Sequence, residues 1–287
     1  MPDQARILRE MVSQKAETKR AIRVISVTSG KGGVGKTAFS VNLALALTDY
    51  GYRVLILDGD LGMANVDVAC GITPVYTMSH LLAGERTIEE IVAAGPKGIG
   101  ILPGGSGVPD LADLERTRLV HSLANLGRLD KMGDILIIDT GAGLNRTVLN
   151  FLRASDDVIL LTTPEPTALT DAYALFKALC QGRESVPVNV VVNRVADEGE
   201  AMETFGRLAA AVERFLHGSL TLLGWVYEDP LVKRAVMEQV PLALTYPASS
   251  AYRCIEWIAG KVSGLYLQPP RSSQGMRGFL NRILRVF

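Results

Sequence analysis

The sequence predicts an α/β protein with a doubly wound, mostly parallel sheet and helices on both of its faces. Short runs of aliphatic and β-branched residues recur along the chain, and they are apolar on both faces, as strands of a covered parallel sheet are. Longer segments with a helical period separate these runs, and this alternation is typical of the doubly wound class. The 287 residues are enough to bury a large core.

The expected elements follow one another in a regular order. Strands are expected at residues 23–27, 54–57, 99–102, 135–138, 158–161, 188–192 and 220–226. The clearest helices are expected at residues 38–50, 111–126, 167–181 and 200–217. We expect four parts in the chain: a polar helix over residues 1–20, one α/β domain over 21–266, a linker over 267–274 and a final helix over 275–287.

Composition excludes several classes of protein. Lys+Arg and Asp+Glu are both 30, so the charge balance gives no sign of a general nucleic-acid surface. The cysteines, Cys70, Cys180 and Cys254, form no CxxC pair, which disfavours a thiolate metal site and fits a reducing compartment. The N-terminus lacks the apolar core of a signal peptide, and no run of about 18 apolar residues exists. The chain is therefore expected in the cytoplasm.

A glycine-rich stretch, SGKGGVGKT, follows the first expected strand and opens the first expected helix. This is the context of a phosphate-binding loop, in which backbone N–H groups and the helix N-terminus point at phosphate oxygens. Lys36 is predicted to reach the β- and γ-phosphates, and the Thr37 hydroxyl to ligate Mg²⁺. The nucleotide-binding residues expected here are Gly30, Lys31, Gly32, Gly33, Val34, Gly35, Lys36, Thr37 and Ala38. A glycine turn with incidental lysines is the structural alternative.

Three aspartates end expected strands beside this loop. Asp139 ends the strand at 135–138, and Asp58 and Asp60 end the strand at 54–57. Because the carboxyl ends of parallel strands share one edge of the sheet, these carboxylates are expected near bound phosphates. Asp139 and Asp58 are predicted to hold Mg²⁺, and Asp60 to orient or deprotonate the attacking water. Loop capping by these side chains is the alternative.

The stretch KGGVGKT, with its early lysine, resembles the deviant Walker A box of the MinD/ParA ATPases, within the signal-recognition, MinD and BioD (SIMIBI) class of P-loop NTPases. Over residues 22–260, LDGDLGMANVD resembles the family's switch I, IIDTGAG its switch II and VVNR its adenine-contacting strand end. The stretch GWVYEDPLVKRAV resembles the second loop around the base, with Tyr227 where the family usually has proline. The resemblance implies an Mg²⁺-dependent ATPase that converts ATP and water to ADP and phosphate. The further nucleotide contacts that it implies are Asn65, Asn193, Arg194, Glu228, Asp229 and Pro230.

Lys31 is a second cation in a loop where Lys36 suffices to bind nucleotide. In the family, the early lysine crosses a dimer interface and contacts the phosphates bound by the other subunit. The resemblance therefore implies a homodimer that forms with ATP, and a catalytic role for Lys31 beside Lys36 and Asp60. A cation delivered in trans stabilises the charge on a transferred phosphoryl group, as an arginine finger does. An exposed lysine on a glycine turn is the alternative.

The last segment, GMRGFLNRILRVF, has the pattern of a basic amphipathic helix. Its apolar stripe at helical spacing consists of Met276, Phe279, Leu280, Ile283, Leu284 and Phe287. Arg277, Arg282 and Arg285 are expected on the other side. This pattern after a linker indicates an anchor for an anionic membrane surface, similar to the membrane-targeting tail of MinD. Docking on the chain's own domain is the alternative, and the two states can alternate, docked in the monomer and released in the dimer.

The N-terminal stretch DQARILR resembles the DQAxxLR motif of the FlhG (YlxH, FleN) branch of the family, which regulates flagellar placement and number. The matching residues are Asp3, Gln4, Ala5, Leu8 and Arg9. In that branch the helix stimulates the GTPase FlhF, and Gln4 is expected to enter or order the partner's active site. A polar leader with no such role is the alternative.

These features predict an ATPase that dimerises with ATP, associates with the inner face of the cell membrane and regulates flagellar number and placement. The expected partners are a second copy of the chain, an FlhF-type GTPase, an anionic membrane surface and flagellar switch-complex proteins. Two other functions stay open: a MinD ATPase that places the division site, and a ParA-type ATPase that partitions DNA. The zero net charge argues mildly against DNA, and the missing cysteine pair disfavours an iron–sulfur carrier.

Overall fold

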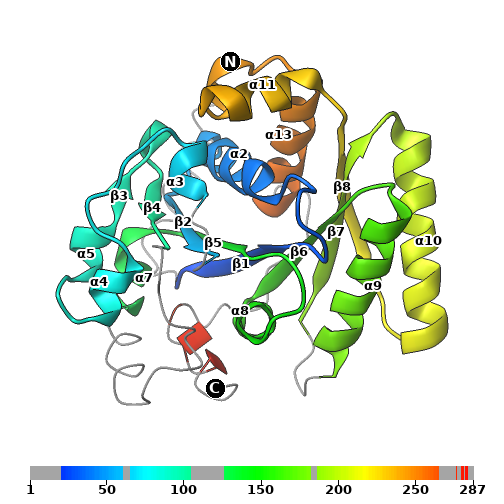
Figure 1. Ribbon diagram of the computed structural model, residues 1–287, viewed down its shortest axis with the longest axis horizontal. Helices are drawn as coiled ribbons and strands as arrows, with labels where there is room; N and C mark the ends of the chain where they lie inside the picture. The colour runs from blue at the N-terminus through cyan, green and yellow to red at the C-terminus, as the bar shows by residue number, and fades with distance from the viewer. Residues whose placement is uncertain are drawn as a thin grey trace, which may run out of the picture.

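The fold is a single sheet with helices packed on both faces (Figure 1). The computed structural model describes residues 21–60, 65–104, 126–181 and 186–264, together with Met276, Phe279, Leu280, Arg282 and Ile283. Within these residues the sheet has eight strands, and β3 (Ala93–Ala94) pairs antiparallel with its neighbour at one edge. The other strand pairs are parallel. The predicted doubly wound, mostly parallel class is confirmed.

The strand order is β3-β4-β2-β5-β1-β6-β7-β8, so the first strand lies inside the sheet. The remaining strands are β1 (Arg23–Thr28), β2 (Val54–Gly59), β4 (Gly100–Leu102), β5 (Ile135–Thr140), β6 (Asp157–Thr162), β7 (Val188–Val195) and β8 (Thr221–Tyr227). All seven of the strands expected from apolar runs are present. Several continue further than expected at their carboxyl ends, because polar residues there stay in the ladder: Asp58 is the register partner of Asp139, and Gly59 that of Thr140.

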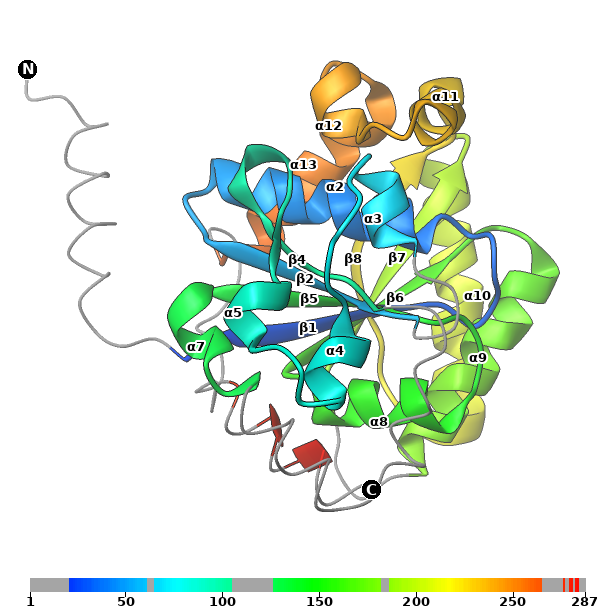
Figure 2. The same ribbon diagram turned by 60° about the vertical axis from the view of Figure 1, so that its left-hand side comes forward.

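One face of the sheet supports the helix that follows the glycine-rich loop. The helices on this face are α2 (Lys36–Asp49), α3 (Val66–Ala69), α11 (Pro230–Glu238), α12 (Leu242–Thr245) and α13 (Ser250–Val262), which lie together above the strands in Figure 2. In α2, residues 39–47 are all buried. Such burial on every side follows because α2 packs between the sheet and α13. The N-terminus of α2 is thereby fixed at the carboxyl end of β1.

The opposite face carries the helices α4 (Met78–Leu82), α5 (Ile88–Ile91), α7 (Leu129–Met132), α8 (Arg146–Ala154), α9 (Pro166–Cys180) and α10 (Glu198–Leu216). The helices expected at 38–50, 167–181 and 200–217 correspond to α2, α9 and α10. The helix expected at 111–126 falls outside the described residues except at its last position. The helix at 1–20 and the linker at 267–274 also lie outside them. No helix in the described part of the chain has the length and apolarity needed to cross a bilayer.

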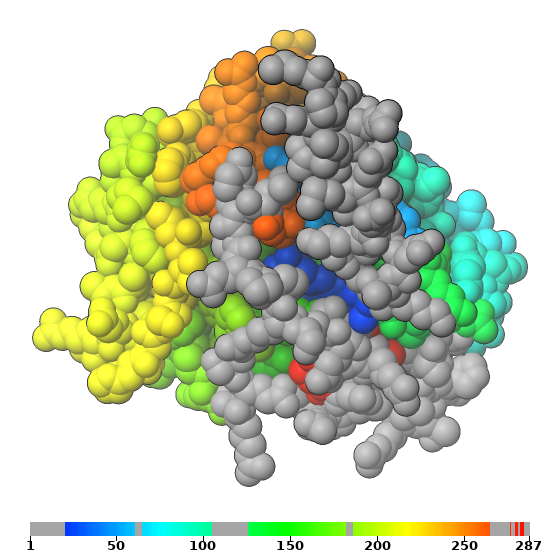
Figure 3. Space-filling view, turned by 180° about the vertical axis from the view of Figure 1, so that it is seen from behind, coloured from blue at the N-terminus to red at the C-terminus, as the bar shows by residue number. Residues whose placement is uncertain are grey.

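The described residues of the C-terminal segment, red in Figure 3, lie against this second face, close to the start of β1. Met276, Phe279, Leu280 and Ile283 are all buried, in one cluster with Ile22, Val24 and Phe151. The stripe that was predicted to meet a membrane therefore covers the chain's own domain in this structure, which is the docked alternative. Leu284 and Phe287, the other residues of the predicted stripe, lie outside the described residues.

The helical pattern predicts Arg282 on the side opposite the stripe, and this prediction is wrong: its guanidinium contacts the domain. Its guanidinium forms an ion pair with the carboxylate of Asp156 at 2.8 Å and donates to the carbonyl of Ala154 at 2.7 Å. Ala154 is the last residue of α8, where a backbone carbonyl has no partner within its own helix. A basic side chain is favoured at such an end. The domain therefore binds the segment through polar contacts with Arg282 as well as through apolar contacts with the stripe.

Candidate nucleotide-binding site

The glycine-rich loop connects β1 to α2, and its shape depends on glycine at three positions. Gly33 and Gly35 have φ values of 79° and 90°, in the left-handed region that glycine adopts without strain. Gly35 also precedes the first residue of α2. At Gly30 a Cβ atom would lie 2.3 Å from the backbone of Asp171 in α9. Helix α9 therefore packs directly on the start of the loop.

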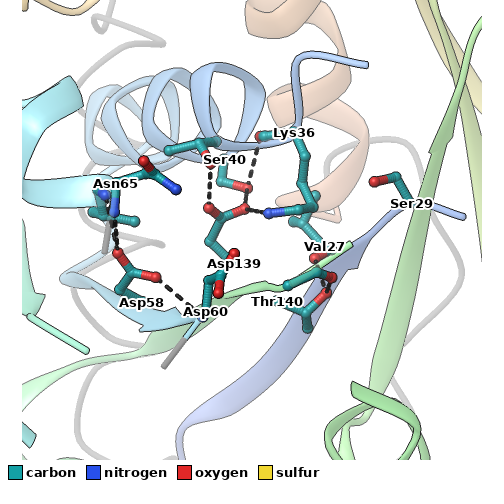
Figure 4. Close-up of polar contacts among 12 residues, drawn as sticks. Val27, Ser29, Lys36, Ser40, Asp58, Asp60, Asn65, Asp139 and Thr140 are labelled. Atoms are coloured by element: carbon teal, nitrogen blue, oxygen red, sulfur yellow. Dashed lines mark hydrogen bonds and ion pairs between the residues drawn. The ribbon is translucent and has the colours of Figure 1, made fainter. Parts of the chain in front are cut away.

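Asp139, at the end of β5, collects the polar side chains of the loop and of α2 (Figure 4). Its carboxylate accepts from Lys36 Nζ at 2.9 Å, from Thr37 Oγ1 at 2.6 Å and from Ser40 Oγ at 2.8 Å. Asp139 and Ser40 are fully buried. The structure thus brings together Lys36, Thr37 and Asp139 as predicted. Ser40 was not predicted, although its position four residues after Lys36 places it on the same side of α2.

These groups suit a magnesium ion. The Thr37 hydroxyl and the Asp139 carboxylate lie side by side, and both offer the oxygen atoms that Mg²⁺ prefers. In the described residues no three His, Cys, Asp or Glu side chains form a cluster that could hold a metal by themselves. A site of this kind fits Mg²⁺ that arrives with a nucleotide, because phosphate and water oxygens then complete its coordination.

Asp58 shapes the neighbouring loop. Its buried carboxylate accepts from the backbone N–H groups of Asp60 at 3.1 Å, Asn65 at 2.7 Å and Val66 at 3.0 Å. Burial raises the pKa of Asp58 to about 6, the backbone hydrogen bonds lower it, and the charge of Asp139 raises it. The side chain therefore caps the loop and the start of α3, which is the alternative stated for it. Its role toward Mg²⁺ stays a prediction, as does the role of Asn65 toward nucleotide.

Asp60 lies where the two switch stretches meet. A Cβ atom on Gly141, in the second stretch, would lie 3.7 Å from the Asp60 carboxyl carbon. The N–H of Gly143, two residues further on, donates to the carbonyl of Ser29 in the glycine-rich loop at 3.1 Å. Asp60 is thus at the correct edge of the sheet. The activation of water by this carboxylate stays a prediction.

Lys31 contacts the start of α9 and none of the aspartates described above. Its Nζ atom lies 2.7 Å from Glu165 Oε2 and 2.9 Å from Thr167 Oγ1. The hydrogen bond from Lys31, together with its charge, lowers the pKa of Glu165. Both side chains are solvent-accessible, at 38% for Lys31 and 56% for Glu165. Glu165 and Thr167 were not predicted, because no sequence pattern links them to the loop. The contact of Lys31 with a second subunit stays a prediction.

Asn193, at the end of β7, packs on the glycine-rich loop. Its Nδ2 atom donates to the carbonyl of Val34 at 2.7 Å, and a Cβ atom on Gly35 would lie only 2.6 Å from it. The next residue, Arg194, has a φ of 59°, a conformation that costs about 1–2 kcal/mol for a residue with a side chain. Arg194 thus forms a bulge within β7, between the paired residues Asn193 and Val195, at the point where a base contact is predicted.

The second predicted loop around the base begins α11. Asp229 accepts from the N–H of Leu231 at 2.9 Å and from Ser250 Oγ at 2.8 Å, which fixes the helix start. Pro230 is the first residue of α11. Glu228 Oε2 lies 4.0 Å from Arg194 Nε. Tyr227 ends β8, half-buried against the cluster of α9 and α10. The nucleotide contacts of these residues stay predictions.

One group of predicted residues cannot be placed. Asp3, Gln4, Ala5, Leu8 and Arg9, the proposed partner-activating residues, lie outside the described residues.

The chain is similar in sequence and in fold to several known proteins. A family model described as an AAA domain matches residues 22–190. Antiactivator FleN of Pseudomonas aeruginosa is 36% identical over 92% of this chain and 94% of its own length. The flagellum site-determining protein YlxH of Helicobacter pylori is 33% identical over 94% and 92%. The septum site-determining protein MinD of Pyrococcus horikoshii, solved with Mg-ADP, superposes with a TM-score of 0.67 at 26% identity, over 85% of this chain and 97% of that one.

Proposed function

The chain belongs to the family of this AAA domain and, within it, to the MinD/ParA ATPases of the FleN and YlxH branch, and on this premise we propose that it is an ATP-hydrolysing dimer that regulates flagellar placement and number. The name of YlxH, a flagellum site-determining protein, supports a role at the flagellum, and the name of FleN, an antiactivator, supports a regulatory role. ATP or ADP, with Mg²⁺, is the ligand of the site. Division-site placement is the second candidate, because MinD proteins are also similar to this chain: the MinD of Bacillus subtilis is 32% identical to it, against 36% for FleN.

The observation that carries the proposal is the arrangement of Lys36, Thr37 and Ser40 around the buried carboxylate of Asp139. Lys36 is held at the mouth of the loop, where its ammonium can donate to β- and γ-phosphate oxygens. Thr37 and Asp139 are the residues that would hold Mg²⁺. When bound, the ion neutralises the charge that develops on the phosphates. Asp60, at the same edge, is proposed to orient the attacking water.

ATP is proposed to join two copies through Lys31. The lysine is exposed and bound to Glu165 in the isolated chain, so it can exchange this partner for the phosphates of a second subunit. Two polyanionic sites approach each other only if their charge is neutralised, and a cation from each subunit does this. Dimerisation would then depend on the nucleotide, because only ATP offers the lysine the γ-phosphate.

The two ends of the chain are proposed to choose the partners. The C-terminal stripe would leave the domain in the dimer and bind the inner face of the cell membrane, where two tails act together. The N-terminal helix would stimulate an FlhF-type GTPase through Gln4. Switch-complex proteins of the flagellum are further proposed partners. The chain would thus be a cytoplasmic protein that associates peripherally with the membrane.

Complementation tests this function. The chain should restore flagellar number in a Pseudomonas aeruginosa strain that lacks FleN, and Lys36→Ala, which weakens phosphate binding, should not. Both proteins must be present at equal levels in immunoblots. If the wild-type chain is present and flagellar number stays abnormal, while division-site placement is restored in a strain that lacks MinD, the second candidate replaces the first.

A further inference from the structure

The docked C-terminal segment is held by polar contacts as well as by its stripe. The backbone N–H of Met276 donates to Asp130 Oδ1 at 2.9 Å. Arg282 Nη2 lies 2.8 Å from Asp156 Oδ1, and Arg282 Nε donates to the carbonyl of Ala154 at 2.7 Å. The domain thus binds the segment at two points, Met276 and Arg282.

The contact between Arg282 and Asp156 differs from an ordinary surface ion pair. The side chains are only 20% and 16% exposed. A charged hydrogen bond in such partly desolvated surroundings is stronger than one in open water, where screening removes most of its effect. The Nε–H of the guanidinium also has a partner, so the domain accepts from two of its nitrogen atoms, which offsets part of the cost of excluding water.

Asp156 is fixed independently of the segment. Its second oxygen, Oδ2, accepts from the N–H of Val24 in β1 at 2.9 Å. Because β1 lies inside the sheet, the carboxylate keeps its place when the segment leaves. The position of the carboxylate that pairs with Arg282 is therefore set by the domain.

A guanidinium binds carboxylates and phosphates with the same planar pair of N–H groups. We propose that Arg282 is a residue that binds the phosphate of anionic lipid headgroups, and that Asp156 is the intramolecular competitor for it. The proposal rests on the membrane association proposed above. When the segment moves from the domain to a neutral surface, Arg282 and Asp156 both lose their ion-pair partner. On an anionic surface, a lipid phosphate replaces the carboxylate as the partner of Arg282. Asp156 therefore sets how much anionic lipid is needed before the segment is released.

The test compares Asp156→Asn with Asp157→Asn in the full chain without nucleotide. The first change keeps a carbonyl for the Val24 N–H and removes the charge that binds Arg282. The second changes the net charge equally at the adjacent residue, which pairs with Arg23 at 2.7 Å and is 20% exposed, against 16% for Asp156. Flotation uses vesicles of phosphatidylcholine alone or mixed with phosphatidylglycerol. We expect Asp156→Asn to bind the anionic vesicles about tenfold more tightly than Asp157→Asn does, as for loss of one charged hydrogen bond.

Wild-type protein with ATP and the anionic vesicles serves as the reference. If it binds and the two asparagine variants behave alike, the competition is overturned and the proposed membrane association stands. If wild-type protein with ATP does not bind, both are overturned. Arg282→Gln gives a second reading in case Asp156→Asn does not fold: it should lower the ratio of anionic to neutral binding several-fold. An unchanged ratio would also overturn the proposal.

Discussion

At the scale of single residues, the two lysines of the glycine-rich loop have different surroundings. Lys36 is nearly buried against Asp139, with Thr37 and Ser40 on the same carboxylate. Lys31 is exposed on Glu165, and exposed ion pairs of this kind contribute little to stability. The first lysine belongs to the interior of one subunit, and the second is available to a partner at little cost.

Lys31→Ala should therefore separate nucleotide binding from turnover. The variant should bind a fluorescent ATP analogue within about twofold of wild type, and should lose dimerisation and hydrolysis together, by about a thousandfold in rate if the lysine acts as an arginine finger does. Sedimentation velocity with ATP and a phosphate-release assay measure the two losses. Lys36→Ala is the matched control and should lose binding as well. Normal turnover by Lys31→Ala would remove the trans role.

Asp60→Ala should give the opposite result in the dimerisation assay. Without the carboxylate the attacking water is not oriented, so ATP persists and the dimer that it joins accumulates. We expect ATP binding near wild type, a dimer that stays after ATP addition, and turnover reduced at least about a hundredfold. A variant that remains monomeric with saturating ATP would contradict the role given to Asp60.

Asp58 predicts a pH dependence of the nucleotide-free protein. Its folded pKa is raised from 3.8 to about 6, so the contribution to stability is complete below about pH 4 and is lost as the pH rises through 6. The loss from this group is about 3 kcal/mol. Urea unfolding below pH 4 and above pH 6 should show this decrease in the free energy of unfolding for wild type. Asp58→Asn should lack it, because asparagine does not titrate. An equal decrease in both proteins would assign the pH dependence elsewhere.

At the scale of elements, the strands could be predicted because their runs are apolar on both faces, as a covered sheet requires. The phosphate loop could be predicted from its glycines and its place between a strand and a helix. The short helices α3, α4 and α5 could not, because they are held by the core clusters and by capping from Thr77 and Thr87 and are too short to show a period. Glu165 escaped prediction because only the packing of α9 on Gly30 brings it near the loop.

Deleting residues 275–287 tests the C-terminal segment as an element. The deletion should abolish flotation with anionic vesicles in the presence of ATP. Nucleotide binding should persist, because the nucleotide site lies at the other end of β1 from the deleted segment. The structure adds a second expectation: the truncated protein loses four buried side chains from the core cluster, so its free energy of unfolding should fall by several kcal/mol, at about 1.5–3 kcal/mol for each. Vesicle binding equal to that of the full chain would remove the anchor.

At the scale of the whole molecule, we propose that one domain and two terminal segments have separate roles. The domain provides a nucleotide site at one edge of the sheet, and the described part of the C-terminal segment lies near the other end of β1. The described residues of both switch stretches lie at the nucleotide edge. In the proposed mechanism, a change at the phosphates must therefore pass through the sheet or through a dimer contact before the tail is released.

A peptide of residues 1–20 tests the partner assignment without the rest of the molecule. It should accelerate GTP hydrolysis by an FlhF-type GTPase, and Gln4→Ala should reduce the acceleration about tenfold or more, as loss of a water-orienting glutamine does in other GTPases. A peptide with the same composition in scrambled order is the control. No acceleration by the intact peptide would leave the flagellar role to rest on the likeness to FleN and YlxH.

Asp130 Oδ1 accepts from the N–H of Ile22 at 3.1 Å and from that of Met276 at 2.9 Å. The first residues of the domain and the first described residue of the C-terminal segment therefore meet at Asp130. Under the roles proposed for the two ends, a partner of residues 1–20 would be held by the same chain that binds lipid through residues 275–287. For a GTPase bound in this way, the proposed membrane association would replace a search in three dimensions by one within a thin layer under the membrane. Its effective concentration there would be raised for as long as the dimer holds ATP.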